Sequence, residues 1–414
     1  MTIAQGNSFV GGAIVGLVVL CTTSTSIMAD DWPFFRGPHN DGVSREAGWN
    51  AKFPDSGPRI AWERDVGIGA SSVVGVGDRV ITMGNRKDKD QDVIYCLNSD
   101  DGSIAWEFPY ANEFEERMFD GGTAATPTVD EGHVYTLSYN GHLHCLKLSD
   151  GTVVWKRNVI DDFDGKPPRW KYSGSPCVVN DMVILDIGGK KNSTIALNKK
   201  TGTKVWGSGK DDAGYAPAIP FSNGDTDAVL VFKGKAMHAL SRADGAELWR
   251  IPWETDYDVN ASSPSVIGDR LFVSAGYNTG RGVLYQLGQG SPKKLWRNDD
   301  IKTKMSSCAI YEGHVYGISE KKSVLMCINM ADGKAVWTEP GMGQYGTLTI
   351  AGDKLIILTD SGTLITVDAS SKGYNQISSA KVLDGNCWVN PMLSNGRIYC
   401  RSNKGKLVCV DVRE

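Results

Sequence analysis

The sequence has few of the features that mark a membrane-spanning, nucleic-acid-binding or redox-active protein. Its main apolar stretch, from Val10 to Cys21, is shorter than the roughly 20 residues that a bilayer-spanning helix requires. Lys and Arg number 44 against 48 Asp and Glu, so the net charge is −4 and no basic surface for nucleic acid is expected. The nine cysteines include no adjacent pair and no Cys-x-x-Cys sequence, which argues against a zinc or dithiol site. Long helical periodicity is also missing beyond the N-terminus, so we expect an all-β protein.

What the sequence does contain is a repeated tryptophan. Seven of them recur at intervals of 41 to 51 residues: Trp62, Trp106, Trp155, Trp206, Trp249, Trp296 and Trp337. Most end a similar phrase, such as CLNSDDGSIAW or ALNKKTGTKVW. Asp-Gly or Thr-Gly between apolar runs marks a tight hairpin, because Gly adopts positive φ without steric cost. The Trp is therefore expected on the second, outer strand of this hairpin.

The residue before each Trp is also apolar, as in Val154 and Leu248. Neighbouring residues on a strand face opposite sides. The pattern therefore predicts that each blade is sandwiched between two other blades.

A second phrase precedes each hairpin, for example ATPTVDEGHVYTLS from Ala125, and it occurs in eight copies. Each copy reads as two strands joined by a turn, so every unit contains four strands. A period in the forties with four strands per unit is typical of a β-propeller. The hairpin after Trp337, VDASSKGYNQISSA, has no Trp, so this unit is degenerate.

The two ends of the repeat region complement each other. The chain ends in LVCVDVRE, which matches the third strand of a unit, and GPRIAW supplies a lone outer strand before the first complete unit. We therefore predict an eight-bladed β-propeller of four-stranded antiparallel blades over residues 59–414. Pairing of the N- and C-terminal strands closes it and removes exposed sheet edges.

The N-terminus is typical of a targeting segment. The apolar stretch is followed by small and polar residues and then by Ala29, after which cleavage is expected. Residues 1–29 are thus predicted to be a signal peptide, and residues 30–58 an N-terminal extension. Because no Lys or Arg precedes the apolar stretch, an uncleaved anchor is the alternative. We expect a periplasmic or secreted protein without an integral membrane domain after cleavage.

The cysteines of the mature chain occupy strand positions. Cys96, Cys145, Cys327 and Cys409 fill one repeat position in different blades. Equivalent strands of different blades are too far apart for the Cα separation of a disulfide, which stays under about 7 Å. Buried free thiols are therefore expected.

The repeat phrases resemble those of the pyrroloquinoline-quinone (PQQ) type propeller superfamily. More narrowly, WPFFRGPHNDGVS, KPPRWKYSGSP and WVNPMLSNGRIYCRSNKGKLVCVDV resemble secreted bacterial PQQ-binding-like repeat proteins. The resemblance extends from Trp32 to the C-terminus. At the repeat level the chain is also similar to the propeller lipoprotein of the outer-membrane barrel-assembly machine. The resemblance implies the fold, and it does not imply that a quinone binds.

Quinone dehydrogenases also resemble this chain in fold. They typically have an adjacent Cys-Cys disulfide, a Glu and an Asn that bind calcium, an Asp base and a Trp beneath the quinone. This chain has no Cys-Cys pair and no haem-binding CxxCH. Its candidate carboxylates are loop aspartates, which are commonly turn formers: Asp161, Asp162, Asp164, Asp256 and Asp258. No catalytic residue, metal site or cofactor is therefore predicted. A PQQ- and calcium-dependent dehydrogenase of alcohols or sugars is the alternative.

One further pair could bind a metal. His142 and His144 in GHLHC are expected to share a strand face, but no third ligand is evident in the sequence. A strand surface is the simpler interpretation.

A candidate binding surface comes from the connections between blades. Each outer strand leads back to the innermost strand of the next blade, so these connections should surround one mouth of the central channel. Several of them carry aromatic and polar residues: Arg169, Trp170, Tyr172, Tyr215, Trp253, Tyr257, Tyr345, Trp388 and Asn390. Aromatic and Arg residues are common anchors of binding sites. They either fill the channel and pack between blades, or bind a protein, peptide or carbohydrate. We expect a non-catalytic binding scaffold of the cell envelope.

Overall fold

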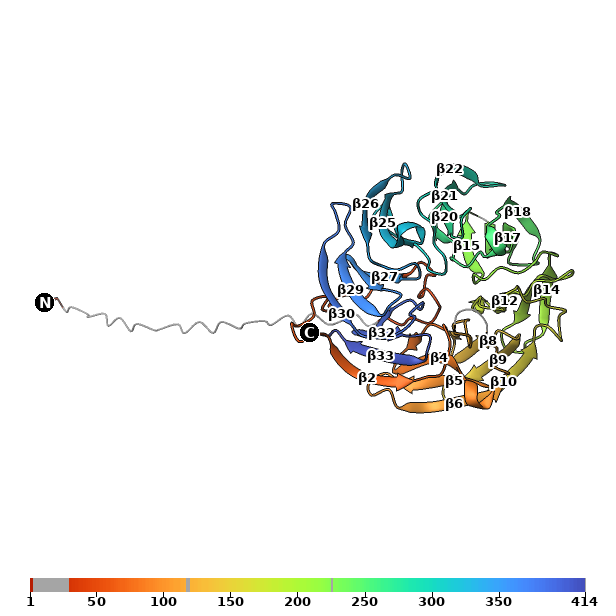
Figure 1. Ribbon diagram of the computed structural model, residues 1–414, viewed down its shortest axis with the longest axis horizontal. Coiled ribbons are helices and arrows are strands. Elements are labelled where there is room, and N and C mark those ends of the chain that lie inside the picture. The colour runs from red at the N-terminus through yellow and green to blue at the C-terminus, as the bar shows by residue number, and fades with distance from the viewer. Residues whose placement is uncertain (3–29, 117–119, 225, 414) are drawn as a thin grey trace.

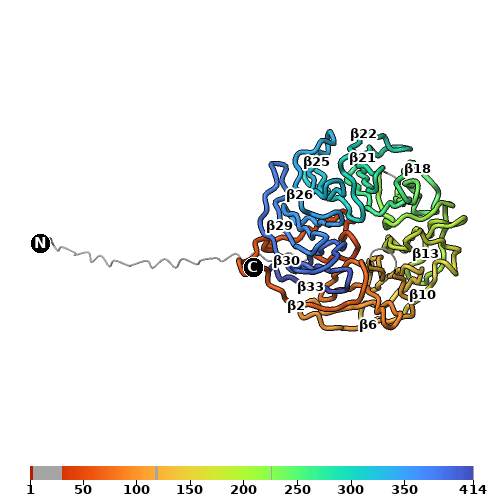
Figure 2. The backbone as a smooth tube through the Cα atoms, in the orientation of Figure 1, coloured from red at the N-terminus to blue at the C-terminus, as the bar shows by residue number. Residues whose placement is uncertain are grey.

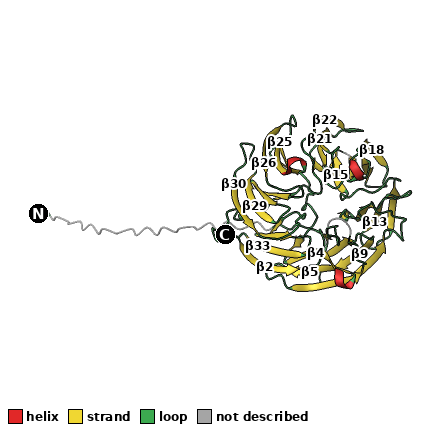
Figure 3. Cartoon of the chain, viewed as in Figure 1, coloured by secondary structure: helices red, strands yellow, loops and turns green. Residues whose placement is uncertain are grey.

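Eight small antiparallel sheets are arranged around a central axis and together form a disc (Figure 1). The computed structural model describes residues 1–2, 30–116, 120–224 and 226–413. Strands and loops make up nearly all of this chain (Figure 3), and its helical content is three short 3₁₀ turns, η1 (Lys87–Lys89), η2 (Asp256–Asp258) and η3 (Lys321–Ser323). The predicted eight-bladed all-β propeller is confirmed.

The blades follow one another along the chain, and in each the first strand lies nearest the axis, where it contacts the first strand of a neighbouring blade. Blade 1 contains β3 (Val74–Val76), β4 (Arg79–Arg86), β5 (Gln91–Asn98) and β6 (Ile104–Ala111). Blade 2 contains β7 (Thr128–Asp130), β8 (His133–Leu137), β9 (His142–Lys147) and β10 (Val153–Asn158). Blade 3 contains β11 (Cys177–Val179), β12 (Met182–Asp186), β13 (Thr194–Asn198) and β14 (Lys204–Ser208).

Blade 4 repeats this arrangement with β15 (Ile219–Asn223), β16 (Thr226–Phe232), β17 (Ala236–Ser241) and β18 (Glu247–Pro252). Blade 5 contains β19 (Ser265–Ile267), β20 (Arg270–Ala275), β21 (Arg281–Gln286) and β22 (Lys293–Asn298). Blade 6 contains β23 (Ala309–Tyr311), β24 (His314–Ser319), β25 (Val324–Asn329) and β26 (Ala335–Pro340). Blade 7 contains β27 (Thr347–Ala351), β28 (Lys354–Leu358), β29 (Thr363–Asp368) and β30 (Gln376–Lys381).

Blade 8 closes the ring with strands from both ends of the repeat region. It contains β31 (Met392–Ser394), β32 (Arg397–Arg401) and β33 (Lys406–Asp411), and its outer strand is β2 (Arg59–Asp65). β2 pairs antiparallel with β33, and Trp62 lies opposite Cys409. The predicted closure is therefore confirmed, and the C-terminal strand has a partner from the start of the propeller.

Contacts between blades explain the spacing of the Gly and the Trp in the repeated phrase. The indole nitrogen of Trp106 in blade 1 donates a hydrogen bond to the carbonyl oxygen of Leu148 in blade 2, 2.8 Å away. The same indole covers the hairpin glycine of blade 2, Gly151, where an added Cβ would lie 2.7 Å from the ring. Gly151 also has φ of 73°. The glycine is thus required both by the turn and by the Trp of the preceding blade.

The predicted packing of a blade between two others is confirmed for blade 2, which shares one buried cluster with blade 1 and another with blade 3, but the residue before the Trp takes no part in this packing. Val154 is 39% exposed and Leu248 is 40% exposed, whereas the Trp after each is buried. In blade 2 the register shifts between Val153 and Trp155, a β-bulge that leaves both residues before the Trp facing solvent. The outer strand lies at the rim, so only its Trp side packs on another blade.

Blade 7 has Ser378 where the other blades have Trp. Ser378 pairs with Thr366, as Trp106 pairs with Cys96. The N-terminal extension fills the space: the amide of Phe53 donates to the Ser378 hydroxyl at 2.8 Å, and the Thr366 hydroxyl donates to the carbonyl of Ala51 at 2.7 Å. Phe53 is buried in the cluster between blades 7 and 8. The degenerate hairpin is therefore completed from elsewhere in the chain.

The rest of the extension crosses the end of the channel at which the innermost strands finish. Trp32 pairs with Gly75 of β3 and is 2% exposed. The extension then contacts β7 through Pro33, and β1 (Val43–Ser44) pairs parallel with β27. The Glu46 carboxylate accepts hydrogen bonds from the amides of Asn395 and Gly396. In Figure 2 the red N-terminal tube passes through the middle of the ring.

The cysteines of the described chain form no disulfide bonds. Eight cysteines are free and buried in the described chain, as expected. The predicted signal peptide, residues 1–29, lies outside the described residues except for its first two. Within the described ranges, no helix has the length and apolar character needed to cross a bilayer.

Candidate functional site

A cavity of about 200 Å³ occupies the central channel toward the end at which the innermost strands start. Its walls come from the residues that precede the innermost strands, including Thr126, Ser175 and Val389, and from aromatic side chains on the surrounding loops. Each innermost strand starts at this end, so the connections between blades gather here. The expected mouth therefore exists and opens into one cavity.

Three predicted residues line this cavity: Trp170, Tyr215 and Trp388. Three more pack on them. Tyr345 stacks on Trp388 with ring centroids 4.6 Å apart, and Tyr257 meets Trp170 edge-on at 6.2 Å. The Arg169 guanidinium lies over the Trp170 ring at 5.1 Å. We call these six residues the aromatic mouth: Arg169, Trp170, Tyr215, Tyr257, Tyr345 and Trp388.

The other three predicted residues do not line the cavity. The Tyr172 hydroxyl donates to the Ile187 carbonyl at 2.8 Å inside a buried cluster. Trp253 is fully buried in the cluster of blades 4 and 5, and its ring meets Phe232 edge-on. Asn390 is buried, and its amide donates to the Leu348 carbonyl at 2.9 Å. All three support the walls from within.

The cavity also contains aromatic residues that the sequence reasoning missed. Tyr139 and Tyr277 come from connections between the second and third strands of blades 2 and 5, and Phe35 comes from the extension. Only connections between blades were considered in the sequence, so both tyrosines were overlooked. A count of aromatics in every loop at this end would have found them. No local signal places Phe35, because its position depends on the extension entering the channel.

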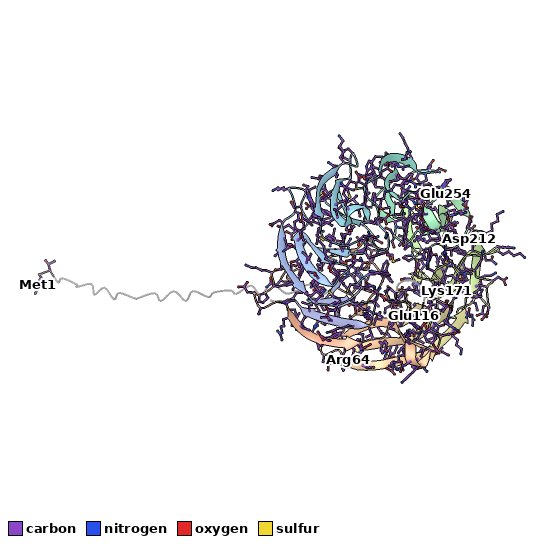
Figure 4. All side chains as sticks on the ribbon, in the orientation of Figure 1. Met1, Arg64, Glu116, Lys171, Asp212 and Glu254 are labelled. Carbon is purple, nitrogen blue, oxygen red and sulfur yellow. The ribbon has the colours of Figure 1, made fainter. Side chains whose placement is uncertain are left out.

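Cationic side chains surround the aromatic mouth. Lys171 pairs with Glu115 at 2.9 Å, and Figure 4 shows Lys171 closer to the centre of the disc than the rim residue Arg64. Lys304 lies over the rings of Tyr277 and Tyr345, 5.3 and 4.9 Å from their centroids, and pairs with Glu320 at 3.1 Å.

Arg169 is exposed, and no acidic side chain within the described ranges forms an ion pair with it. Burial raises the pKa of Tyr215 to about 12, so this phenol stays neutral at ordinary pH. The mouth is therefore mainly apolar, with positive charge at its edge.

The donor set does not match a calcium-bound quinone, which needs several oxygen ligands and a carboxylate base. Among the described lining residues the single carboxylate is Glu115, and it pairs with Lys171. Nor does the described chain group three or more His, Cys, Asp or Glu side chains in a way that could hold a metal ion.

His142 and His144 share a face of β9, with ring centroids 6.4 Å apart. Both rings pack edge-on or tilted against Tyr110 of blade 1. Burial lowers the pKa of His144 to about 3, so the imidazole is neutral. The pair belongs to the contact between blades 1 and 2.

Comparisons with known proteins agree on the type of propeller. The chain is 25% identical to outer membrane protein assembly factor BamB of Yersinia pestis over 66% of this chain and 66% of that protein. It is 23% identical to BamB of Escherichia coli (strain K12) over 85% of this chain and 88% of that protein. It is also 23% identical to tetrathionate hydrolase of Acidithiobacillus ferrooxidans over 67% of this chain. The matched region spans about two thirds of the Yersinia protein and half of the hydrolase.

Solved structures show the same fold. The crystal structure of BamB from Moraxella catarrhalis matches with a TM-score of 0.62 at 15% identity, covering 85% of this chain and 96% of that one. A europium-containing methanol dehydrogenase matches with a TM-score of 0.68 at 13% identity, covering 92% and 89%. At such low identity these likenesses establish the fold alone. The family model PQQ_2, described as outer membrane protein assembly factor BamB, matches residues 89–339. That range is more than half of the chain, and the protein therefore belongs to the PQQ_2 family of BamB-like propellers.

Proposed function

We propose that this protein is an exported, non-catalytic propeller of the cell envelope that binds another molecule at its aromatic mouth. The observation that carries the proposal is the convergence of six residues from five inter-blade connections around one apolar cavity. Concave, mainly apolar sites with a few polar groups are typical of binding sites. The partner class is taken from the relatives: BamB is by name an assembly factor of the outer membrane, so we propose a protein partner in the envelope.

The proposed location follows from the same relatives and from the N-terminus. Residues 1–29 would direct export, and cleavage after Ala29 would leave Trp32 free to dock on β3 as described above. An uncleaved anchor would tether the propeller from the face that the extension crosses, which leaves the aromatic mouth facing away from the membrane.

A quinone-dependent dehydrogenase is the second candidate, favoured by the structural likeness to methanol dehydrogenase. The side chains of the mouth do not match the oxygen ligands and the carboxylate base that a calcium-bound quinone needs, which argues against this candidate. Reconstitution of the purified protein with PQQ and Ca²⁺, followed by absorbance and dye reduction with alcohols, separates the two candidates. Stoichiometric quinone uptake with alcohol-dependent dye reduction would establish the second.

The binding proposal is tested by capture from an envelope fraction of the source cells. The wild type is compared with a Trp170→Ala, Trp388→Ala double variant, in which two walls of the cavity are removed. The matched control is a Val205→Ala, Leu248→Ala double variant, which removes exposed apolar side chains from the rim. We expect the captured partner to be lost from the mouth variant and kept by the control. A partner retained equally by all three proteins would refute binding at the mouth.

A further inference from the structure

The channel is closed from one side, which makes the cavity a pocket with a floor. Phe35 of the N-terminal extension lines the cavity. Its neighbour Arg36 holds this part of the extension in place, because the buried guanidinium donates to the Ser265 hydroxyl at 3.1 Å and to the carbonyl of Cys308. These two partners belong to blades 5 and 6, so the extension is fixed across the axis. Phe35 therefore sets the depth of the pocket.

The size of the pocket limits its occupant to about one ring. Its volume is about 200 Å³. A cavity of about 150 Å³ lined by apolar side chains binds benzene. A six-membered ring with a short substituent fits such a space, whereas a large fused ring system does not fit without movement of the floor.

The chemistry of the walls favours an aromatic ring over a sugar. A sugar ring needs many hydrogen bonds, but three hydroxyl groups of the wall already make hydrogen bonds with the backbone. The Thr126 hydroxyl accepts from the Ser72 amide at 3.0 Å, and the Ser175 hydroxyl accepts from the Thr126 amide at 3.0 Å. The Ser173 hydroxyl donates to the Tyr215 carbonyl at 3.0 Å. The remaining surface is mainly apolar and includes six aromatic residues, and aromatic rings pair favourably edge-to-face or offset.

The edge of the pocket favours a negative charge on the same ligand. Arg169 is exposed beside the cavity, and its guanidinium is positioned over Trp170. The neighbouring cations Lys171 and Lys304 pair with Glu115 and Glu320, and the nearby Asp258 lies 4.0 Å from Lys235. Arg169 is thus the cation left to bind an anionic group, and a guanidinium suits a carboxylate.

We propose that the closed channel is a pocket for a single aromatic ring carried by an anionic ligand, with Phe35 setting the size of the ring and Arg169 binding the charge. This inference rests on the proposed binding function of the mouth. The ring and charge could come from a free aryl carboxylate or from an aromatic residue in an acidic peptide, which share the same chemistry.

The role of Phe35 as the floor of the pocket is tested by measuring which size of ring the pocket prefers. Binding of phenylacetate and 2-naphthylacetate is measured by calorimetry to the wild type, to Phe35→Ala and to the control Phe34→Ala, which shortens the neighbouring aromatic residue. We expect the wild type and the control to prefer phenylacetate, and Phe35→Ala to shift the ratio of affinities at least several-fold toward 2-naphthylacetate. Thermal unfolding of each variant verifies that it is folded. An unchanged ratio in folded Phe35→Ala, or no phenylacetate binding to the wild type, would overturn the proposal.

The charge is tested with Arg169→Gln, with Arg297→Gln as the control because Arg297 pairs with Asp299 at the rim. We expect Arg169→Gln to weaken phenylacetate binding about 2- to 5-fold, the range for an exposed ion pair, and to leave binding of neutral phenylacetamide unchanged. Equal effects on both probes would contradict the role of Arg169.

The source of the ligand is distinguished with an acidic peptide containing one Phe and its Phe-to-Ala counterpart. Tighter binding of the Phe peptide than of phenylacetate supports a peptide source, and weaker binding supports a free aryl carboxylate. If neither probe binds while the Trp170→Ala, Trp388→Ala variant still loses its captured partner, this inference fails and the proposed function stands.

Discussion

The guanidinium of Arg36 donates a hydrogen bond to the hydroxyl oxygen of Ser265, 3.1 Å away, although the two residues are 229 positions apart in the chain. Burial lowers the pKa of Arg36 to about 10, yet the group still remains charged at neutral pH. A buried charge is stable only with hydrogen-bond partners, and those partners belong to the inner strands of the propeller. The extension is therefore part of the folded core.

Arg36→Met should loosen the extension. The change removes the donor to the carbonyl oxygen of Pro264 and one of the two donors to the carbonyl oxygen of Cys308, which keeps the hydrogen bond from the Ser265 hydroxyl. Buried acceptors left without a donor cost about 1–3 kcal/mol. We expect a lower free energy of unfolding in urea and faster hydrogen exchange over residues 31–46. Arg45→Met, at an exposed position, serves as the control. Exchange rates as slow as in the wild type would mean that the extension docks without this residue.

Trp155→Ala should lower the free energy of unfolding by about 3–5 kcal/mol, the range for a large aromatic side chain in a packed core. Its ring covers Gly202 of the next blade, and its indole nitrogen donates to the Lys199 carbonyl at 2.9 Å.

Trp32→Ala would cost much less than Trp155→Ala if the extension did not dock on the propeller. It does dock, and Trp32 lies in a buried cluster with Trp62 and Tyr399. We therefore expect a loss for Trp32→Ala similar to that for Trp155→Ala in chemical unfolding. A loss below about 1 kcal/mol would show that this cluster contributes little to the core, since deletion of a packed aromatic costs more.

Truncation after Gly405 should remove most of the stability. The truncation deletes β33, which is the partner of both β2 and β32. Blade 8 would then lose its central pairing, and the ring would open with exposed edges. We expect a large decrease in the temperature of thermal unfolding and a less cooperative transition. A truncated protein that melts like the full chain would contradict closure by these strands.

Stability should depend on the protonation of His144. Burial lowers its pKa from 6.5 to about 3 in the folded chain. Between these pH values the unfolded chain binds a proton that the folded chain does not, so the stabilisation is present above pH 6.5 and is lost as the pH falls toward 3. The integrated effect is about 4–5 kcal/mol at most, at about 1.36 kcal/mol for each unit of pKa.

His144→Phe, whose ring can pack on Phe108 and Tyr110, isolates this contribution. The comparison with the wild type is needed because the titration of Asp92, which lies beside Tyr110, changes the stability with pH in the opposite direction. Burial raises the pKa of Asp92 to about 6, so its stabilisation is lost as the pH rises through that value. Urea unfolding at several values between pH 4 and 7 should show a smaller loss of stability on acidification in His144→Phe. Parallel profiles for the two proteins would contradict the neutral, buried imidazole.

The repeat architecture could be predicted from the sequence because its signals are local. Hairpin glycines such as Gly151 and the Trp four residues later lie within one strand–turn–strand unit, and the spacing counts the units. The docking of Trp32, and the filling of blade 7 by Phe53, could not be predicted in this way. Both depend on contacts between residues far apart in the chain. The exposure of Val154 was missed because a bulge breaks the simple alternation of strand faces.

The candidate site was predicted in part for a similar reason. Connections between blades must gather at one mouth, so Trp170 and Trp388 were found from topology alone. Whether an aromatic in such a connection points into the channel or into a blade depends on packing. Tyr172 and Trp253 point into buried clusters, whereas Phe35 reaches the cavity from the N-terminal extension.

Site-specific photo-cross-linking in the source cells shows whether the aromatic mouth is the binding surface. A photo-reactive phenylalanine analogue is placed at Tyr257, which is 63% exposed at the mouth, and at Val205, which is 51% exposed at the rim. A third position, Arg45, samples the face that the extension crosses. We predict a discrete cross-linked adduct from position 257 and none from positions 205 and 45. Adducts from position 205 or 45, with none from position 257, would place the binding surface elsewhere on the propeller.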